Sequence, residues 1–245
     1  MSTTTAKSDT FPMMKIHDWF DGPYPARVRI ALAEKGLLSQ IEFKSVNLWT
    51  GEHKQPQFLA LNYSGTLPVL ELQDGTLLAE CTAITQYLDV LDGTPTLTGE
   101  TPVEKGLIHM MTKRAEIEVL DAVSQYFHHA TPGLGPKVEL YQNAEWGGRM
   151  RDKALRGMGY FNGLLERQPF VAGDRFSMAD IALLGGMIFA GLVKLTVPVE
   201  YSALHEWHVR IQQRPSVQEW RAMVERGAPA QLQELQELQE LSSQG

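Results

Sequence analysis

Residues 62–91 constrain the fold of this chain more than any other stretch. Within them, two apolar segments are separated by Asp74-Gly75, and Asp-Gly between such segments predicts an antiparallel β-hairpin. Pro68 stands directly before the first of the two strands and is a candidate for a cis peptide bond. We therefore expect a loop, a hairpin and then a helix, in that order.

The helix after the hairpin begins near Glu80 and continues with Cys81 and Thr82. The first turn of a helix has unpaired backbone N–H groups. Beside the acid of Glu80 and two small polar side chains, these donors suit a ligand that carries both a carboxylate and an amine. A cis bond before Pro68 would leave the backbone of Leu67 facing the same amino-acid-shaped ligand.

The chain before this stretch predicts alternating strands and helices. Residues 13–19 and 41–48 read as strands, and residues 25–36 read as a helix with proline at its first position and glycine at its end. Residues 53–61 form a short helix interrupted by Pro56. The order β-α-β-α-β-β-α is that of a thioredoxin-like domain. Crossover rules make the first strands parallel and the hairpin antiparallel.

Residues 93–102 have the glycine, proline and threonine content of a linker, and the sequence beyond them is helical in pattern. We expect a disordered leader over 1–12, an α+β thioredoxin-like domain over 13–92, an all-α domain over 103–226 and a low-complexity tail over 227–245. The leucines of the tail recur every third residue, which favours a frayed appendage over a coiled coil.

The expected helices of the second domain lie at 103–129, 137–168 and 177–195, with two shorter ones between 202 and 226. Ser177-Met-Ala-Asp180 is a capping box, in which each of the two polar side chains accepts from the backbone of the other residue. The helix that it opens is apolar on nearly every side. We expect a buried core helix there.

Composition and charge exclude several classes of protein. The net charge of −7 disfavours nucleic acid and anionic membranes as partners, because both attract clustered Lys and Arg. One cysteine permits neither an internal disulfide nor a multi-cysteine metal site, and it fits a reducing compartment. The most apolar run, 181–193, is shorter than the roughly 20 residues that span a bilayer, and the N-terminus lacks a signal-peptide pattern. We expect a cytoplasmic protein that contacts no membrane, nucleic acid or metal.

The loop, hairpin and helix of residues 62–91 resemble the glutathione site of cytosolic glutathione transferases, and the likeness extends over about 14–225. It is closest to the atypical fungal-type and theta-like branch that lacks the usual catalytic Tyr, Ser or Cys. The resemblance implies a homodimeric enzyme that uses glutathione as co-substrate and a hydrophobic electrophile as second substrate. The residues that it assigns to glutathione are His53 and Lys54 for the glycyl carboxylate, Thr66, Leu67 and Pro68 for the cysteinyl part, and Glu80 and Cys81 for the γ-glutamyl end.

Activation of the glutathione thiol needs a separate explanation, because Gly22 occupies the position of the usual catalytic Ser. One candidate is the N-terminus of the helix that opens at Pro25, and another is the hydroxyl of Tyr24. Ser124 and His128 are four residues apart on one helical face, where they could hold a water that accepts the thiol proton. The spacing alone favours a structural role, with His128 hydrogen-bonded locally near the helix C-terminus and Ser124 bonded back to a carbonyl. The resemblance instead implies that this pair activates the thiol.

Other functions remain open at this point. The same fold serves as a non-catalytic glutathione-binding or protein-interaction module, or as a glutathione-dependent peroxidase or thiol oxidoreductase. Cys81 as a redox nucleophile is one form of the last, because a helix N-terminus would lower its pKa. A metal site from His109, His128 and His129 has no recognised spacing. A second set of residues could line the electrophile pocket: Met110, Met111, Tyr126, Phe127 and Tyr141.

Overall fold

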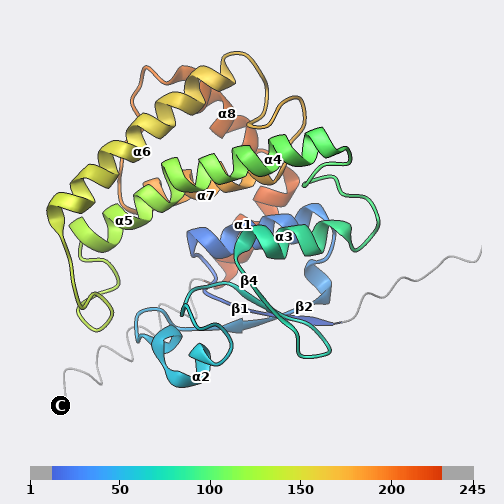
Figure 1. Ribbon diagram of the computed structural model, residues 1–245, viewed down its shortest axis with the longest axis vertical. Coiled ribbons are helices and arrows are strands. Elements are labelled where there is room, and N and C mark those ends of the chain that lie inside the picture. The colour runs from blue at the N-terminus through green and yellow to red at the C-terminus, as the bar shows by residue number, and fades with distance from the viewer. Residues whose placement is uncertain (1–12, 228–245) are drawn as a thin grey trace, which may run out of the picture.

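The computed structural model describes residues 13–227, arranged as a small α+β domain beneath a helical one (Figure 1). The expected leader over 1–12 and nearly all of the expected tail therefore lie outside the described residues. The first domain has the order β-α-β-α-β-β-α. Its elements are β1 (Met14–Asp18), α1 (Pro23–Glu34), β2 (Ile41–Ser45), α2 (Pro56–Leu59), β3 (Val69–Glu71), β4 (Leu77–Ala79) and α3 (Cys81–Val90), with short 3-10 turns η1 (Leu38–Gln40) and η2 (Glu52–Lys54).

The strands form one four-stranded sheet in the order β2-β1-β3-β4. β1 and β2 pair in parallel, and Ile16 lies opposite Phe43. β3 runs antiparallel to β1 and to β4, so the hairpin closes the sheet at one edge. The thioredoxin-like order and the strand directions expected from the sequence are both confirmed.

Helices cover both faces of the sheet. α1 and α3 lie on one face, where Val28, Leu32 and Ile84 are fully buried against the strands (Figure 1). α2 lies on the other face, where Phe58 packs with Val69 in a smaller cluster. The other side of α1 is also apolar and packs against the helical domain through residues such as Ile30.

The regular elements of the second domain are all helices over its described residues, joined by loops and one isolated β-bridge between Phe170 and Gly173. Residues 102–130 form one continuous helical path in which α4 passes through a π-helical segment, η3, into α5. Residues 215–227 are also helical. The bounds are α4 (Pro102–Ala115), η3 (Glu116–Leu120), α5 (Asp121–Ala130), α6 (Ala144–Leu165), α7 (Met178–Leu192) and α8 (Ser202–Gln212). No helix among the described residues is long and apolar enough to cross a membrane.

Two expected helix boundaries are wrong. α1 begins at Pro23 rather than at Pro25, because Gly22 adopts the extended conformation of an N-cap. The helix expected over 137–168 begins at Ala144, where the Asn143 side chain accepts from Trp146 N. Residues 131–143 form a loop instead, and this loop contributes to the site described below.

The capping box at the start of α7 is confirmed. The Ser177 side chain accepts from the first-turn backbone, while Asp180 accepts from Ser177 N at 3.1 Å. Asp180 also accepts from Val171 N and Trp207 Nε1, so this fully buried carboxylate joins α7 to α8. Burial raises its pKa to about 6. The cap fixes the core helix on which α1 and α5 pack.

Candidate functional site

The loop that precedes β3 is held by the side chain of Asn62. Its amide donates to the Thr66 carbonyl at 3.0 Å and to the Thr66 hydroxyl at 3.1 Å. The peptide bond between Leu67 and Pro68 is cis, as the sequence predicts. Lys54 lies against the same loop, and its ammonium donates to the Gly65 carbonyl at 2.8 Å. The expected glycyl and cysteinyl contacts of glutathione are therefore neighbours in space.

His53 lies beside Lys54 but is buried, with only 4% of its surface exposed. Its Nδ1 has no hydrogen-bond partner among the described residues. Burial, followed by the charge of Lys54, lowers the pKa of His53 from its ordinary value of 6.5 to about 4. At neutral pH this imidazole is an uncharged hydrogen-bonding group next to a cation.

The start of α3 carries a strained residue. Glu80 is exposed and has φ 67° and ψ 117°, a left-handed conformation that residues other than glycine rarely adopt. No side chain caps the helix after it, so the backbone N–H groups of its first turn are open to a ligand. The structure thus presents both a carboxylate and free N–H donors at the point where the sequence places the γ-glutamyl end of glutathione.

Cys81 points away from this opening. Its thiol is buried against the sheet and donates to the Tyr24 carbonyl at 3.3 Å. Burial raises its pKa to about 11, which is the opposite of the lowering expected from a helix N-terminus. The thiol is therefore a packed, protonated donor, and only the backbone N–H of Cys81 is offered to a ligand.

The N-terminus of α1 offers few donors. Pro23 and Pro25 have no N–H, so Tyr24 supplies the free N–H within these first three helical positions. The Tyr24 hydroxyl donates to Asp121 Oδ1 on α5 at 2.8 Å. Burial is the main cause of its strongly raised pKa, and a hydrogen bond with Ser124 partly opposes that shift. Tyr24 therefore joins α1 to the face of α5 that carries Ser124, and its proton is already donated to Asp121.

A buried ion pair links the two domains next to α3. Arg27 on α1 donates to Glu116 Oε1 at 2.7 Å, and Thr82 donates to the same oxygen at 2.7 Å. Lys113 pairs with the other oxygen of Glu116 at 3.1 Å. Glu116 is the first residue of the π segment, a local distortion that often marks functional positions in helices. No sequence pattern indicates this network, because its four members lie on α1, α3, α4 and η3.

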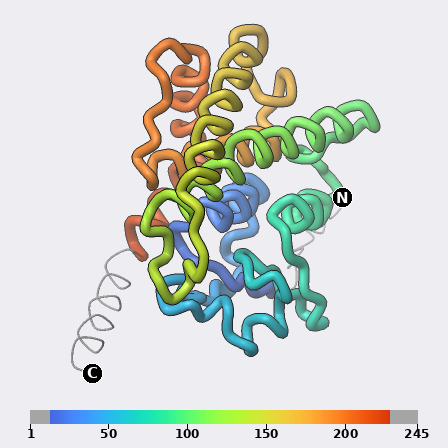
Figure 2. The backbone as a smooth tube through the Cα atoms, turned by 60° about the vertical axis from the view of Figure 1, so that its left-hand side comes forward, coloured from blue at the N-terminus to red at the C-terminus, as the bar shows by residue number. Residues whose placement is uncertain are grey.

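Ser124 and His128 lie on α5 as expected, but His128 has a partner that the sequence analysis missed. Ser124 is buried, whereas about a third of the His128 side chain is exposed. His128 Nδ1 lies 2.7 Å from Oε1 of Glu139, in the loop 131–143. That loop extends from the end of α5 toward η2 and α2 of the first domain (Figures 1 and 2). His128 and Glu139 are consequently close enough to His53 to affect its pKa.

The apolar residues near this site differ from the set expected for an electrophile pocket. Phe127 packs on Phe189 of α7, with ring centroids 5.3 Å apart, and Phe189 packs in turn on Tyr24 at 6.5 Å. Met111 instead lies in the core of the helical domain, and Tyr141 is 72% exposed. The expected Met and Tyr cluster is not brought together. An aromatic wall of Tyr24, Phe127 and Phe189 stands beside Ser124 and His128 in its place.

The described residues include no group of three or more His, Cys, Asp or Glu side chains that could hold a metal ion. The three histidines considered for a metal site have different surroundings. His109 is exposed on α4, His128 pairs with Glu139, and His129 accepts from Asn143 N.

Comparison with known proteins defines the class of this fold and site. The N-terminal domain model of glutathione S-transferases matches residues 21–91, and the C-terminal domain model of the same family matches residues 136–215. The chain is 70% identical to glutathione S-transferase 2 of Saccharomyces cerevisiae over 204 residues, which cover 83% of this chain and 88% of the relative.

Solved structures agree with the sequence comparison. The crystal structure of Gtt2 from Saccharomyces cerevisiae superposes with a TM-score of 0.84 at 69% identity, covering 84% of this chain and 99% of that one. A glutathione S-transferase domain-containing protein of Marinobacter aquaeolei gives 0.81 at 46% identity, covering 83% and 99%. The chain belongs to the glutathione S-transferase family and is an enzyme of the glutathione transferase class.

Proposed function

We propose that this protein conjugates reduced glutathione to small hydrophobic electrophiles, as a detoxifying enzyme of the cytoplasm. The observation that carries the proposal is the meeting of two sets of side chains across the domain boundary. His53 and Lys54 of the first domain, which the family resemblance assigns to glutathione, lie within electrostatic range of the His128–Glu139 pair of the second. A thiol held by the first set would lie near a base carried by the second.

The charges and donors of the first domain fit glutathione, which carries two carboxylates and one amine. Lys54 supplies a cation, and His53 an uncharged donor, for the glycyl carboxylate. The backbone at Thr66, Leu67 and Pro68 pairs with the cysteinyl part. The free N–H groups at Cys81 bind the γ-glutamyl carboxylate, and the exposed Glu80 carboxylate binds the amine. These five contacts leave the thiol as the group without a partner in the first domain.

Ser124 and His128 activate that thiol. A thiol with a pKa near 8.5 is only a few per cent ionised at pH 7, and lowering that pKa by one unit needs about 1.4 kcal/mol of preference for the thiolate. In the proposed step the S–H bond breaks, a bound water relays the proton, and His128 accepts it at Nε2. Glu139 is bonded to Nδ1 of His128, and Nε2 has no hydrogen-bond partner among the described residues, so Nε2 is available to accept a proton. The partial charge at the N-terminus of α1 adds a smaller contribution through Tyr24 N–H.

The electrophile binds against the exposed parts of Tyr24 and Phe127, which both pack on the buried Phe189. Ring faces and edges of this kind favour planar, apolar molecules. Phe127 and Tyr24 are the partly exposed members of the wall, and the Phe127 ring centroid is 4.9 Å from that of His128. An electrophilic carbon stacked on Phe127 would therefore be near the activated thiol.

Conjugation of glutathione to a chlorinated aromatic compound tests the proposal in wild type, Ser124→Ala and His128→Ala. General base catalysis contributes on the order of a hundredfold or more, so we expect kcat for His128→Ala to fall about a hundredfold and that for Ser124→Ala less. His205→Ala, on α8, is the control and should keep wild-type rates. Unchanged rates in both active-site variants would refute the activation step.

The same assay separates the other functions of this fold. Tight glutathione binding without conjugation by the wild type would favour a non-catalytic glutathione-binding or protein-interaction module. Reduction of peroxide or of a mixed disulfide by glutathione, with no conjugation, would favour a peroxidase or oxidoreductase. The buried, protonated thiol of Cys81 argues against the last of these.

We also propose that the protein is a homodimer, joined through α3 and α4. Val103, Leu107 and Met110 follow the spacing i, i+4, i+7 along α4 and are 70%, 45% and 39% exposed. Val90 on α3 is 54% exposed. An apolar stripe of this kind on a helix that is already packed on its other side indicates a protein partner.

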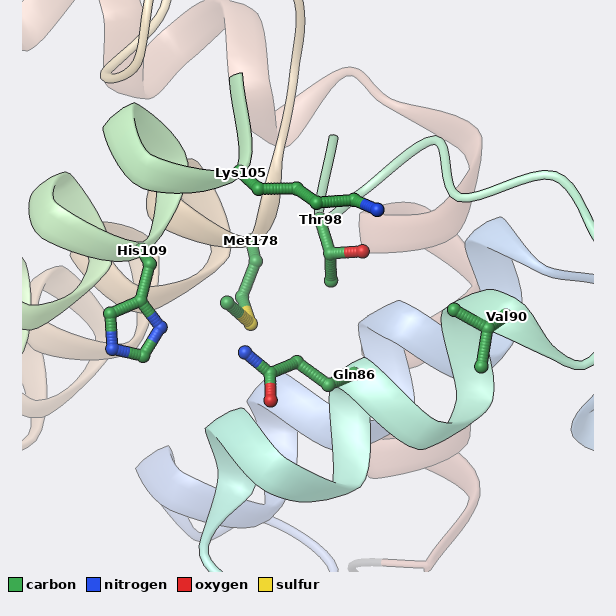
Figure 3. A pocket seen from close by; sticks show the side chains of 6 residues that line it. All are labelled: Gln86, Val90, Thr98, Lys105, His109 and Met178. Carbon is green, nitrogen blue, oxygen red and sulfur yellow. The ribbon is translucent and has the colours of Figure 1, made fainter. Parts of the chain in front are cut away.

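A pocket of about 230 Å³ lies between the same two helices. Figure 3 shows Gln86 and Val90 projecting from α3 and Lys105 and His109 from α4, with the Met178 side chain between them. Sedimentation of wild type and Leu107→Glu would test the interface. We expect a dimer for the wild type and a monomer for the variant; a monomeric wild type would contradict the proposal.

A further inference from the structure

The pair formed by Glu139 and His128 is unlike an ordinary surface contact. The Glu139 side chain is only 9% exposed, and its Oε1 lies 2.7 Å from His128 Nδ1 and 2.8 Å from Leu134 N. Neither contact is between sequence neighbours on one helix. The loop 131–143 therefore turns back on α5 and places one carboxylate oxygen between a backbone donor and an imidazole.

The loop is built to hold this carboxylate. Gly133 has φ 56°, and a Cβ at that position would lie 2.3 Å from Glu139 Oε1, so only glycine leaves room for it. Thr131 donates to Phe127 O, and Gln142 donates to His128 O and to Thr131 O at 2.8 Å. These bonds cap the last carbonyls of α5 and fix both ends of the loop relative to His128.

The position of Glu139 decides which nitrogen of His128 is basic. A carboxylate accepts only, so Nδ1 must carry the proton of the 2.7 Å hydrogen bond. Nε2 is then left with its lone pair and can accept a proton. A carboxylate on Nδ1 also stabilises the imidazolium that forms when Nε2 is protonated, as in the Ser-His-Asp arrangement.

The charged and titratable groups that face this pair come from two domains. They are His128 on α5, Glu139 in the loop, and His53 and Lys54 from η2. Glu139 is the one acid of the four, beside a cation at Lys54 and an uncharged imidazole at His53. It therefore places a negative charge against His128, on the side where Lys54 contributes a positive one.

We infer that Glu139 is a positioning residue for His128: it fixes the Nδ1–H tautomer and stabilises the protonated ring while glutathione is ionised. The inference rests on the proposed role of His128 in thiol activation. Glu139 itself touches neither substrate, and during the step its hydrogen bond to Nδ1–H persists while the thiol proton passes to Nε2. The reaction that follows is unchanged, with the thiolate attacking the electrophile and the leaving group departing.

A purely structural role for Glu139 would have a different kinetic effect. Loss of loop structure would disturb the contacts near His53 and Lys54 and raise the KM for glutathione. Loss of a positioning carboxylate should lower kcat and leave that KM unchanged or lower, because Glu139 is an acid close to the site of the glycyl carboxylate. A raised KM therefore indicates the structural role, and a lowered kcat without a raised KM indicates the positioning role.

The test compares Glu139→Gln with wild type, and with Glu145→Gln, an exposed acid on α6, as control. The amide of Glu139→Gln can still accept from Leu134 N, so the loop should remain. We expect kcat to fall about tenfold, and the pH at which bound glutathione ionises, followed by the ultraviolet absorbance of the thiolate, to rise by about one unit. In a His128→Ala background, Glu139→Gln should cause no further loss.

A second variant tests the position of the Glu139 carboxylate without removing its charge. Gly133→Ala keeps the charge of Glu139 but displaces it, and it should reproduce the fall in kcat and the shift in thiol ionisation. Two results would overturn the inference without affecting the role of His128. One is that Glu139→Gln lowers kcat equally in the wild-type and His128→Ala backgrounds, and the other is that it raises only the KM. Full activity of His128→Ala would instead overturn the proposed activation, and the role of Glu139 with it.

Discussion

Arg27 and Glu116 form an ion pair of 2.7 Å in which both side chains are nearly buried, and it joins the first helix of one domain to the π segment of the other. Thr82, next to the expected γ-glutamyl contacts, donates to the same carboxylate oxygen. The relative position of the two domains is thus tied to the start of α3. In the proposed mechanism glutathione binds to one domain and the base lies on the other, so this ion pair would keep the two halves of the site in place.

Breaking the ion pair on one side should destabilise the protein strongly. Arg27→Met leaves the buried Glu116 with only Lys113 as a charged partner, and removal of one member of a buried pair costs about 3 kcal/mol or more. Adding Glu116→Leu should recover part of the loss, because no buried charge then remains. Chemical denaturation measures both. Arg149→Met, which breaks the exposed pair with Glu145, is the control, and a further loss in the double variant would contradict the expectation.

The sequence predicted the fold well because the fold depends on local patterns. The Asp74-Gly75 turn, the proline at the start of the first helix and the Ser177 capping box are each local, and each element that they predict is present. The thioredoxin-like order and the helical second domain follow from those elements. The errors concern the limits of elements: Gly22 and Asn143 move two helix starts, the strand expected over 41–48 ends at Ser45, and the helix expected over 53–61 is reduced to Pro56–Leu59 after a 3-10 turn.

The sequence could not predict the contacts that join distant segments. Arg27 and Glu116 are 89 positions apart, and each alone reads as an ordinary charged residue on a helix. Glu139 was read as part of a helix, whereas the structure turns it onto His128 from a loop. Cys81 was expected to face a ligand, but the helix start turns its side chain into the core. Direction and burial of a side chain are properties of the packed molecule.

Glu80 should show a conflict between stability and binding. A non-glycine residue at φ 67° and ψ 117° costs on the order of 1–3 kcal/mol, and glycine relieves most of that cost. We expect Glu80→Gly to be about 1 kcal/mol more stable than wild type by urea unfolding and to lose retention on immobilised glutathione. Glu80→Gln should lose retention with unchanged stability. Retention by both variants would show that the Glu80 carboxylate does not bind glutathione.

Two glycines of α6 offer a matched comparison. A Cβ on Gly157 would lie 2.4 Å from the Glu118 carbonyl of the π segment, whereas a Cβ on Gly163 would meet nothing within 4 Å. Gly157→Ala should therefore cost about 2 kcal/mol through overpacking against rigid backbone. Gly163→Ala should instead stabilise the helix by about 0.5–1 kcal/mol. Equal effects in thermal unfolding would mean that α6 does not approach the π segment this closely.

His53 should make the stability of the protein depend on pH on the acid side of neutrality. Burial lowers its pKa from 6.5 to about 4, so the unfolded chain binds a proton that the folded protein does not. The contribution of neutral His53 to the free energy of unfolding is therefore complete above pH 6.5 and is lost as the pH falls toward 4. Between pH 7 and pH 5 this one group should lower the free energy of unfolding by up to about 2 kcal/mol.

His53→Gln, which cannot titrate, should flatten the stability profile over that range relative to wild type, and His109→Gln, exposed on α4, should leave it unchanged. Urea unfolding at a series of pH values measures the difference. Parallel profiles for wild type and His53→Gln would mean that the imidazole is protonated in the folded state. That result would also change its proposed contact with the glycyl carboxylate from a neutral hydrogen bond to an ion pair, with Lys54 no longer the single cation of the pair.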